Sequence, residues 1–214
     1  CLQQGGAMLR TAAFDLRKAG HEVSVLLDER LPWSISGAGV SLVSTIQEMH
    51  EHFDARARNA DVTLVIAPES DGLLVKYLRR LDEIGAYTLN SSVDAAAVSS
   101  DKLATFKQLR AAGVPTPHTE MYTGRGWQPT KDYPATDEYV IKPRMGVGCE
   151  NTAVVGVNTV RELWPQTHDA VIQPRVAGVS ASASVMVHDR QIMPLLAGVQ
   201  HIVEDPAEGG LSLL

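Results

Sequence analysis

The residues from Tyr139 to Glu150 read Tyr-Val-Ile-Lys-Pro-Arg-Met-Gly-Val-Gly-Cys-Glu. An apolar strand is predicted to end at Lys142, and a short loop with Gly146 and Gly148 leads directly into a second strand at 152–157. Glycine lets backbone N–H groups approach an anion closely, and the lysine adds a point charge. The stretch is therefore a candidate phosphate-binding loop. It lacks the GxxxxGK[ST] pattern of a P-loop, and a glycine hairpin with a chance lysine explains it equally well by itself.

The length and composition of the chain limit the number of domains and the classes of partner that can be expected. The chain has 214 residues, 44% of them hydrophobic and 21% charged, with a formal net charge of −6. This length allows one or two domains, and the charge gives no reason to expect nucleic acid or an anionic membrane as a partner. Two cysteines do not suggest a disulfide framework, so a reducing compartment, the cytoplasm, is expected. No apolar run reaches membrane-spanning length, and no signal peptide opens the chain.

The first part of the chain alternates helical and strand patterns. A start without methionine and an end without a stop signal predict an internal fragment of a longer protein. Residues 1–92 are predicted to form a Rossmann-like, doubly wound α/β domain that lacks its first strand. The expected helices lie at 6–19, 44–60 (with a capping-box-like start at Ser44-Thr45-Ile46-Gln47) and 72–84, the strands at 22–27, 61–66 and 86–89, and a loop at 32–40.

Polar residues follow the predicted strands of this domain. Glu69 comes directly after the strand at 61–66, at the end where open α/β sheets bind ligands, and a functional role and an ordinary loop position are equally favoured. Ser70 or Asp71 is expected to cap the next helix. Ser91 follows the strand at 86–89, where it or Ser92 can cap a short helix.

A second short helix is expected to start at Ser99 or Ser100 and to carry Asp101-Lys102 in its first turn. Acidic residues suit the positive end of a helix, whereas lysine does not. Lys102 is therefore either solvated, which base rates favour, or held there to meet an anion.

The sequence pattern of the second half of the chain predicts short strands. We expect strands at 119–122, up to Lys142, at 152–157 and at 170–173, a helix near 159–164, and a hairpin of 180–187 with 191–197 around His188-Asp189.

Four features stand in a fixed order along this chain: Asp101-Lys102 at a helix start, Gly-Val-Pro-Thr-Pro (113–117), Val-Ile-Lys-Pro (140–143) before the glycine loop, and Val-Ile-Gln-Pro-Arg-Val-Ala-Gly (171–178). The ordered set resembles the ATP-grasp superfamily of carboxylate–amine ligases. Several phrases are similar to the branch that contains tyramine–L-glutamate ligase of methanofuran synthesis and its bacterial relatives: 20–31, Ile-Ala-Pro-Glu-Ser-Asp-Gly (66–72), 90–102 and Gln-His-Ile (200–202).

The resemblance implies a fold and a division of the chain. A pre-ATP-grasp domain would cover 1–92, a helical linking segment 93–118, the small ATP-binding lobe 119–175, and the start of a second grasp lobe 176–214. It implies an amide-forming reaction in which ATP phosphorylates a glutamate-like carboxylate and an amine attacks the acyl phosphate. Small-molecule carboxylate and amine substrates would be the partners, with homodimer formation left open.

Carried over from the family, the site residues lie mostly in the second half. Lys102 and Lys142 match the two lysines that contact ATP phosphates, and Gly146 and Gly148 match the loop that closes over them. The hinge that reads the adenine edge would run from Gln173 to Val176. Glu69, Ser91 and His201 are the expected substrate-side residues, and no catalytic residue is assigned.

The chain departs from the family pattern at several positions. The hinge usually begins with an acid, where Gln173 offers an amide oxygen, and Ser180 stands where a ribose-binding acid is expected. Arg144 and Arg175 either add positive potential over the phosphates or are solvated. Cys149 is expected to pack rather than react.

The Mg²⁺ ligands are the largest departure. The Glu-x-Asn pair that would hold Mg²⁺ is absent after the hinge, so no metal ligand is expected within this chain. The alternatives to a ligase are a non-catalytic or degenerate ATP-binding grasp domain and an α/β protein that binds sugar or nucleotide diphosphates.

Overall fold

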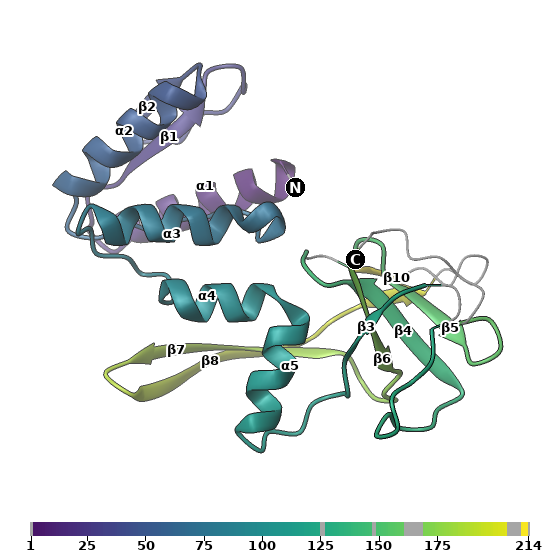
Figure 1. Ribbon diagram of the computed structural model, residues 1–214. Coiled ribbons are helices and arrows are strands. Elements are labelled where there is room, and N and C mark those ends of the chain that lie inside the picture. Colours follow the sequence, from purple (N-terminus) through teal and green to yellow (C-terminus); the bar gives the residue numbers. More distant parts are fainter. Residues whose placement is uncertain (1, 125–126, 147–148, 161–168, 205–210, 214) are drawn as a thin grey trace. The chain divides into compact units, whose positions relative to one another are not determined.

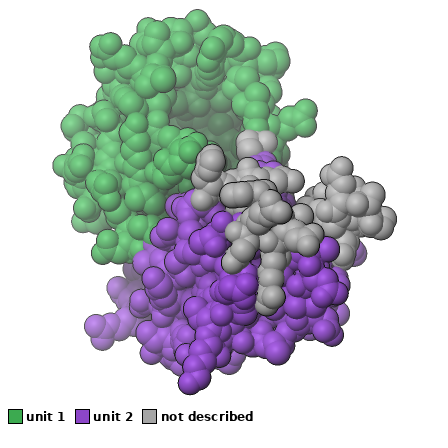
Figure 2. Space-filling model, turned by 45° about the vertical axis from the view of Figure 1, so that its right-hand side comes forward, with its two compact units in different colours: residues 1–97 green, residues 98–214 purple. Residues whose placement is uncertain are grey.

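A computed structural model describes residues 2–124, 127–146, 149–160, 169–204 and 211–213 (Figure 1). The chain divides into two compact units, residues 1–97 and 98–214 (Figure 2). Each unit has hydrophobic clusters of its own, two in the first and one in the second. Within the described residues, no helix has the length and apolar character needed to cross a membrane.

Unit 1 alternates helices with short extended segments. Its elements are α1 (Leu2–Lys18), β1 (Ser24–Asp28), β2 (Gly39–Val43), α2 (Ile46–Asn59), the 3₁₀ turn η1 (Ser70–Gly72), α3 (Leu73–Glu83) and α4 (Val93–Ser100), whose last residues enter unit 2. Strands β1 and β2 are parallel, with Leu26 opposite Ser41. The predicted loop at 32–40 therefore ends earlier than expected, because β2 begins at Gly39.

The predicted strands at 61–66 and 86–89 are reduced to one parallel bridge between Thr63 and Thr88. The prediction of a continuously buried strand was wrong, since Val62 and Leu64 are 44% and 42% exposed. The amide of Asn90 takes the place of ladder hydrogen bonds at Val65. Its Oδ1 accepts from the Val65 N–H at 2.8 Å, and its Nδ2 donates to the Val65 carbonyl oxygen at 2.9 Å.

The helix starts of unit 1 differ in how they are capped. Thr45 caps α2 and forms a complete capping box with Glu48, so the box ends one residue beyond the stretch 44–47 that the sequence indicated. Helix α3 has no side-chain cap, so the prediction that Ser70 or Asp71 caps it was wrong. Gly72 precedes the helix in the left-handed region, with φ 66°.

Unit 2 is built on a four-stranded antiparallel sheet in the order β3-β6-β4-β5. Its elements after α4 are α5 (Lys102–Ala111), β3 (Glu120–Tyr122), β4 (Glu138–Pro143), β5 (Ala153–Gly156), β6 (Ala170–Pro174), β7 (Ala181–His188), β8 (Gln191–Val199), β9 (Ile202–Glu204) and β10 (Leu211–Leu213). Strands β7 and β8 form the predicted hairpin, which turns at Asp189 and Arg190. The helix predicted near 159–164 falls mostly outside the described residues.

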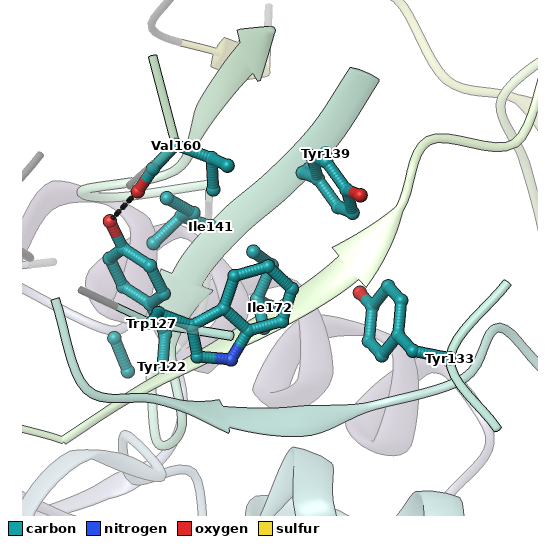
Figure 3. Packing of buried hydrophobic residues seen from close by; sticks show 8 residues of the cluster. Tyr122, Trp127, Tyr133, Tyr139, Ile141, Val160 and Ile172 are labelled. Carbon is teal, nitrogen blue, oxygen red and sulfur yellow. Dashed lines mark hydrogen bonds between the residues drawn. The ribbon is translucent and has the colours of Figure 1, made fainter. Parts of the chain in front are cut away.

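One face of the four-stranded sheet carries the core of unit 2. Its buried side chains form one cluster: Tyr122, Trp127, Tyr133, Tyr139, Ile141, Val160, Ala170 and Ile172 (Figure 3). The hydroxyl of Tyr122 donates to the carbonyl oxygen of Val160, which ties β3 to the segment after β5. We call this side of the sheet the aromatic face.

The side chains on the opposite face of the sheet follow from the alternation of side chains along each strand. Successive side chains of a strand point to opposite sides, and directly paired residues share a side. Lys142 pairs with Val171, and Val140 pairs with both Gln173 and Val154. These five residues therefore share the face opposite the aromatic cluster, which we call the lysine face.

Candidate nucleotide-binding site

Lys142 lies on the lysine face near the end of β4. Burial lowers the pKa of its ammonium, and the positive charge of Lys102 lowers it further. In the described part of the chain, no carboxylate lies within ion-pair distance of Lys142 and no hydrogen bond to its Nζ is formed. A partly buried cation that lacks a protein counter-ion is unfavourable, and an anionic ligand would relieve this cost.

Lys102 reaches the same region from α5. Its Nζ donates to the carbonyl oxygen of Gly146 at 2.9 Å. Gly146 has φ 112°, a conformation that residues with a Cβ rarely adopt, and a Cβ there would meet open space. The glycine is therefore required by the backbone turn and not by crowding. Gly148, the second predicted glycine of the loop, lies outside the described residues.

Asp101 holds the start of α5. Its carboxylate accepts from the N–H groups of Leu103 at 2.9 Å and Ala104 at 3.1 Å, so it is the N-cap of this helix. Ser99 or Ser100 was expected to cap this helix. That prediction was wrong, because Asp101 is the N-cap and the helix begins at Lys102.

Arg144 joins the end of β4 to this cap. Its Nε and one Nη donate to the two oxygens of Asp101 at 2.9 and 2.6 Å, and its backbone oxygen accepts from the Lys102 N–H at 3.1 Å. The Arg144 N–H donates to the Asp169 carbonyl oxygen at 2.9 Å. The guanidinium is therefore paired with a protein carboxylate and only partly exposed, so Arg144 is not simply a solvated surface residue. It fixes the helix that carries Lys102 against the strand that carries Lys142.

Gln173 lies on the lysine face in β6, two pairs along the ladder from the pair that contains Lys142. Its Nε2 donates to Thr119 Oγ1 at 2.7 Å. On this face Val140 lies opposite Gln173 and beside Val154, and both valines are partly buried, whereas Val171, opposite Lys142, is fully buried. The face thus offers an apolar surface with a cation at one end and an amide at the other.

The remaining predicted hinge residues lie further along the chain. The Arg175 Nη1 contacts Glu138 Oε2 at 3.2 Å, and both side chains are exposed. Val176 is exposed, and so is Ser180, whose carbonyl oxygen accepts from Gln200 N–H at 2.8 Å. No described contact links Val176 or Ser180 to Lys142.

Of the three expected substrate-side residues, two lie in unit 1 and one lies in unit 2. Glu69 is partly buried and precedes η1, and Ser91 is exposed before α4, where Ser92 rather than Ser91 provides the side-chain cap. His201 is exposed between β8 and β9. Cys149 adopts φ 61° and is partly buried, close enough to Lys142 to influence its charge.

The described residues suit a nucleotide better than a metal ion. Two ammonium groups and a glycine turn are suited to phosphate oxygens, and the valines are suited to a flat base. Across the described ranges, no group of three or more His, Cys, Asp or Glu side chains could hold a metal ion.

The sequence predicted the two lysines as site residues, but it did not predict Asp101 as the cap, Asp169 as a partner of Arg144, or Thr119 as the partner of Gln173. The alternation of Val140, Lys142, Val171 and Gln173 was the available signal, because it places all four on one face once the strands are paired.

Two family models match the sequence. Residues 21–96 match the pre ATP-grasp 3 domain, and residues 99–210 match the ATP-grasp domain. No protein of curated function matches the sequence.

Several solved structures share the fold. An ATP-grasp superfamily protein from Archaeoglobus fulgidus is 24% identical with a TM-score of 0.66, over 92% of this chain and 54% of that one. An N5-carboxyaminoimidazole synthetase from Staphylococcus aureus, complexed with ADP, is 15% identical with a TM-score of 0.66, over 90% and 52%. A D-alanine–D-alanine ligase from Coxiella burnetii is 20% identical with a TM-score of 0.55, over 65% and 44%.

The chain spans about half the length of these solved structures. The likeness confirms the predicted fold, a pre-grasp domain followed by a grasp domain. The family match covers more than half of the sequence, so the chain belongs to the ATP-grasp family.

Proposed function

We propose that this chain supplies the ATP-binding part of a ligase that joins a carboxylate to an amine. The observation that carries the proposal is the partly buried Lys142, which has no counter-ion in the described part of the chain and faces the charge of Lys102. A triphosphate would neutralise both ammonium groups. The Gly146 turn, already bonded to Lys102, lies beside that charge.

The proposed reaction has two steps. A carboxylate oxygen attacks the γ-phosphorus of ATP, the bond to the ADP oxygen breaks, and an acyl phosphate forms. The amine nitrogen then attacks the carbonyl carbon, phosphate leaves with the C–O electron pair, and the nitrogen loses a proton to give the amide. Lys102 and Lys142 would hold the phosphates and offset their charge, which is the electrostatic part of such catalysis.

The substrates follow from the sequence resemblance. A glutamate-like carboxylate and an amine such as tyramine are proposed, in the synthesis of a methanofuran- or methylofuran-type cofactor. Mg²⁺ is proposed to accompany ATP, with ligands outside the described residues. A cytoplasmic location is proposed from the cysteine content. The alternative is an ATP-binding grasp domain without catalysis, which the amide of Gln173 in place of the usual acid supports.

The test measures ATP binding by calorimetry and ADP release by the full-length protein. Lys142→Met keeps the apolar stem but removes the charge, and we expect ATP affinity to fall about 100-fold, near the upper range for lost charge-assisted hydrogen bonds. Lys107→Ala, on the exposed side of α5, is the matched control and should leave affinity unchanged. An unchanged affinity in Lys142→Met would refute the site.

Substrate dependence separates the two functions. ADP release that requires both an amino-acid carboxylate and an amine supports the ligase. ATP binding without ADP release, for every such pair offered, supports the non-catalytic domain instead.

A further inference from the structure

The side-chain amide of Gln173 is held in one orientation by Thr119. The amide nitrogen donates to Thr119 Oγ1 at 2.7 Å. Thr119 precedes β3 and is 2% exposed, and it lies opposite Gln173 when the β3–β6 register is continued by one pair. The contact is thus part of the sheet and joins two residues that are 54 positions apart.

The chemistry of Thr119 decides which end of the amide it faces. Its hydroxyl carries one proton, which it donates to the carbonyl oxygen of Pro117 at 3.0 Å. A carbonyl oxygen can only accept, so the proton is committed to Pro117. The Thr119 oxygen can then only accept from Gln173. The amide N–H₂ therefore faces Thr119, and Oε1 points away from it.

The amide oxygen is left as an acceptor at the edge of the lysine face. Gln173 pairs with Val140 and lies diagonally from Lys142 across the same two strands. Among the described residues, Oε1 has no protein donor, and Gln173 is only partly buried. A ligand that covers the valines and places an N–H group at their end would satisfy this oxygen.

We propose that Thr119 is a positioning residue that makes Gln173 select adenine over 6-oxo purines. This inference rests on the proposed ATP site. With its orientation locked, the amide presents an acceptor to the 6-amino group of adenine, as a carboxylate would but without a charge. Hypoxanthine and guanine carry an oxygen at that position, and two acceptors would then face each other without a proton between them.

While the hydroxyl is present, reversing the amide would cost the hydrogen bond from Thr119 to the Pro117 carbonyl oxygen, because the hydroxyl proton would have to turn to Gln173. In Thr119→Val the amide nitrogen has no acceptor at that side, so the amide can rotate by half a turn and offer N–H to a 6-oxo purine. In Gln173→Glu both oxygens accept, so no orientation has to be chosen. Thr119 should therefore matter for base selection when residue 173 is Gln and not when it is Glu.

The experiment compares ATP with inosine triphosphate, which has an oxygen in place of the 6-amino group and a proton on N1. Dissociation constants are measured by calorimetry on the full-length protein without acceptor substrates. We expect the wild type to favour ATP by about tenfold or more, and Thr119→Val to reduce that ratio about tenfold, the value of roughly one hydrogen bond. Thr119→Ser keeps the hydroxyl and should keep the ratio.

The double variant Thr119→Val/Gln173→Glu completes a double-mutant cycle with the two single variants. Its preference for ATP should equal that of Gln173→Glu alone, because a carboxylate needs no orientation. Thermal unfolding confirms that each variant is folded. Thr119→Ser provides a folded comparison if Thr119→Val does not fold, and its loss of selectivity would overturn the inference.

Two failures are distinguishable. If ATP binds and Lys142→Met weakens both nucleotides equally, but Thr119→Val leaves the ratio unchanged, the role of Thr119 is refuted and the ATP site stands. If neither nucleotide binds the wild type, the proposed site itself fails. An equal effect of Thr119→Val in the Gln and Glu backgrounds would also refute the orientation argument.

Discussion

Arg144 and Asp101, 43 residues apart in the sequence, form a two-pronged ion pair that fastens the end of β4 to the start of α5. The side chains are 34% and 15% exposed, so the pair is only partly screened by water. The paired geometry suits a guanidinium and not an ammonium. Because α5 begins with Lys102 and β4 carries Lys142, the pair sets the spacing of the two candidate phosphate-binding lysines.

Arg144→Lys tests this spacing. The variant keeps the charge but loses the two-pronged contact, so we expect ATP affinity to fall about tenfold, with stability lowered by about 1 kcal/mol. Calorimetry and urea unfolding give the two values. Arg30→Lys is the matched control, since Arg30 makes a similar contact with Asp28 at an exposed position. Equal losses of affinity in both variants would contradict the special role of Arg144.

The affinity for ATP should depend on pH through Lys142. Burial and Lys102 lower the pKa of Lys142 below the ordinary lysine value of 10.5. As pH rises through this lowered pKa, Lys142 loses its charge, so ATP affinity should decline at a lower pH than in a protein with an ordinary lysine.

Stability should change in the opposite direction. The unfolded chain keeps the Lys142 proton up to the ordinary pKa, so it binds more protons than the folded chain between the two values. The free energy of unfolding should therefore rise with pH in that window. Titrations of binding and unfolding, with Lys142→Met as reference, check both signs. A parallel change of both quantities in the wild type would count against the assignment.

Acid should weaken the start of α5. Hydrogen bonds from Arg144, opposed by desolvation, lower the pKa of Asp101 from 3.8 to about 2. A lowered carboxyl pKa contributes stability above the unfolded value, and this stability is lost as pH falls from about 4 to about 2. The contribution is about 2 kcal/mol.

Asp101→Asn should abolish this part of the acid sensitivity while it keeps a helix cap. Asp28→Asn is the comparison. Arg30 also lowers the pKa of Asp28 to about 2, but these residues are two positions apart and can pair in the unfolded chain. Acid unfolding monitored by circular dichroism should therefore change in Asp101→Asn and remain unchanged in Asp28→Asn.

Asn90 is expected to stabilise unit 1. Its amide makes both bonds to Val65, and its Oδ1 also accepts from the Thr88 hydroxyl at 2.9 Å. Asn90→Ala removes these contacts and should cost about 2 kcal/mol. Asn59→Ala, which removes one exposed bond to the Ala55 carbonyl oxygen, should cost almost nothing. Urea unfolding measures both, and equal costs would show that Asn90 has no such role.

Local patterns predicted much of this molecule. Thr45 with Glu48 has the spacing of a capping box, and the run before Lys142 alternates as strands do, so α2 and β4 could be placed from neighbouring residues. The strand at 61–66 was mispredicted because an apolar run indicates burial but not which groups satisfy its backbone. Asn90, 25 residues away from Val65, does that here.

The contacts that organise the candidate site connect distant residues. Thr119 meets Gln173, and Arg144 meets Asp101, only after the strands have paired. No periodicity within one segment encodes such partners. The sequence alone could not decide the role of Arg144, because its partner Asp101 lies 43 positions away in the chain.

The aromatic face gives unit 2 an optical reporter. Trp127 is 4% exposed, with ring centroids of Tyr133 and Tyr139 at 5.4 and 5.7 Å. Its emission should be blue-shifted and fed by excitation of these tyrosines, and both properties should vanish when the cluster opens (Figure 3). Since Trp127 lies on the side of the sheet away from Lys142 and Gln173, its fluorescence, measured in a variant whose other tryptophans, Trp33 and Trp164, are replaced by phenylalanine, can follow unfolding of this unit while remaining insensitive to a nucleotide on the lysine face.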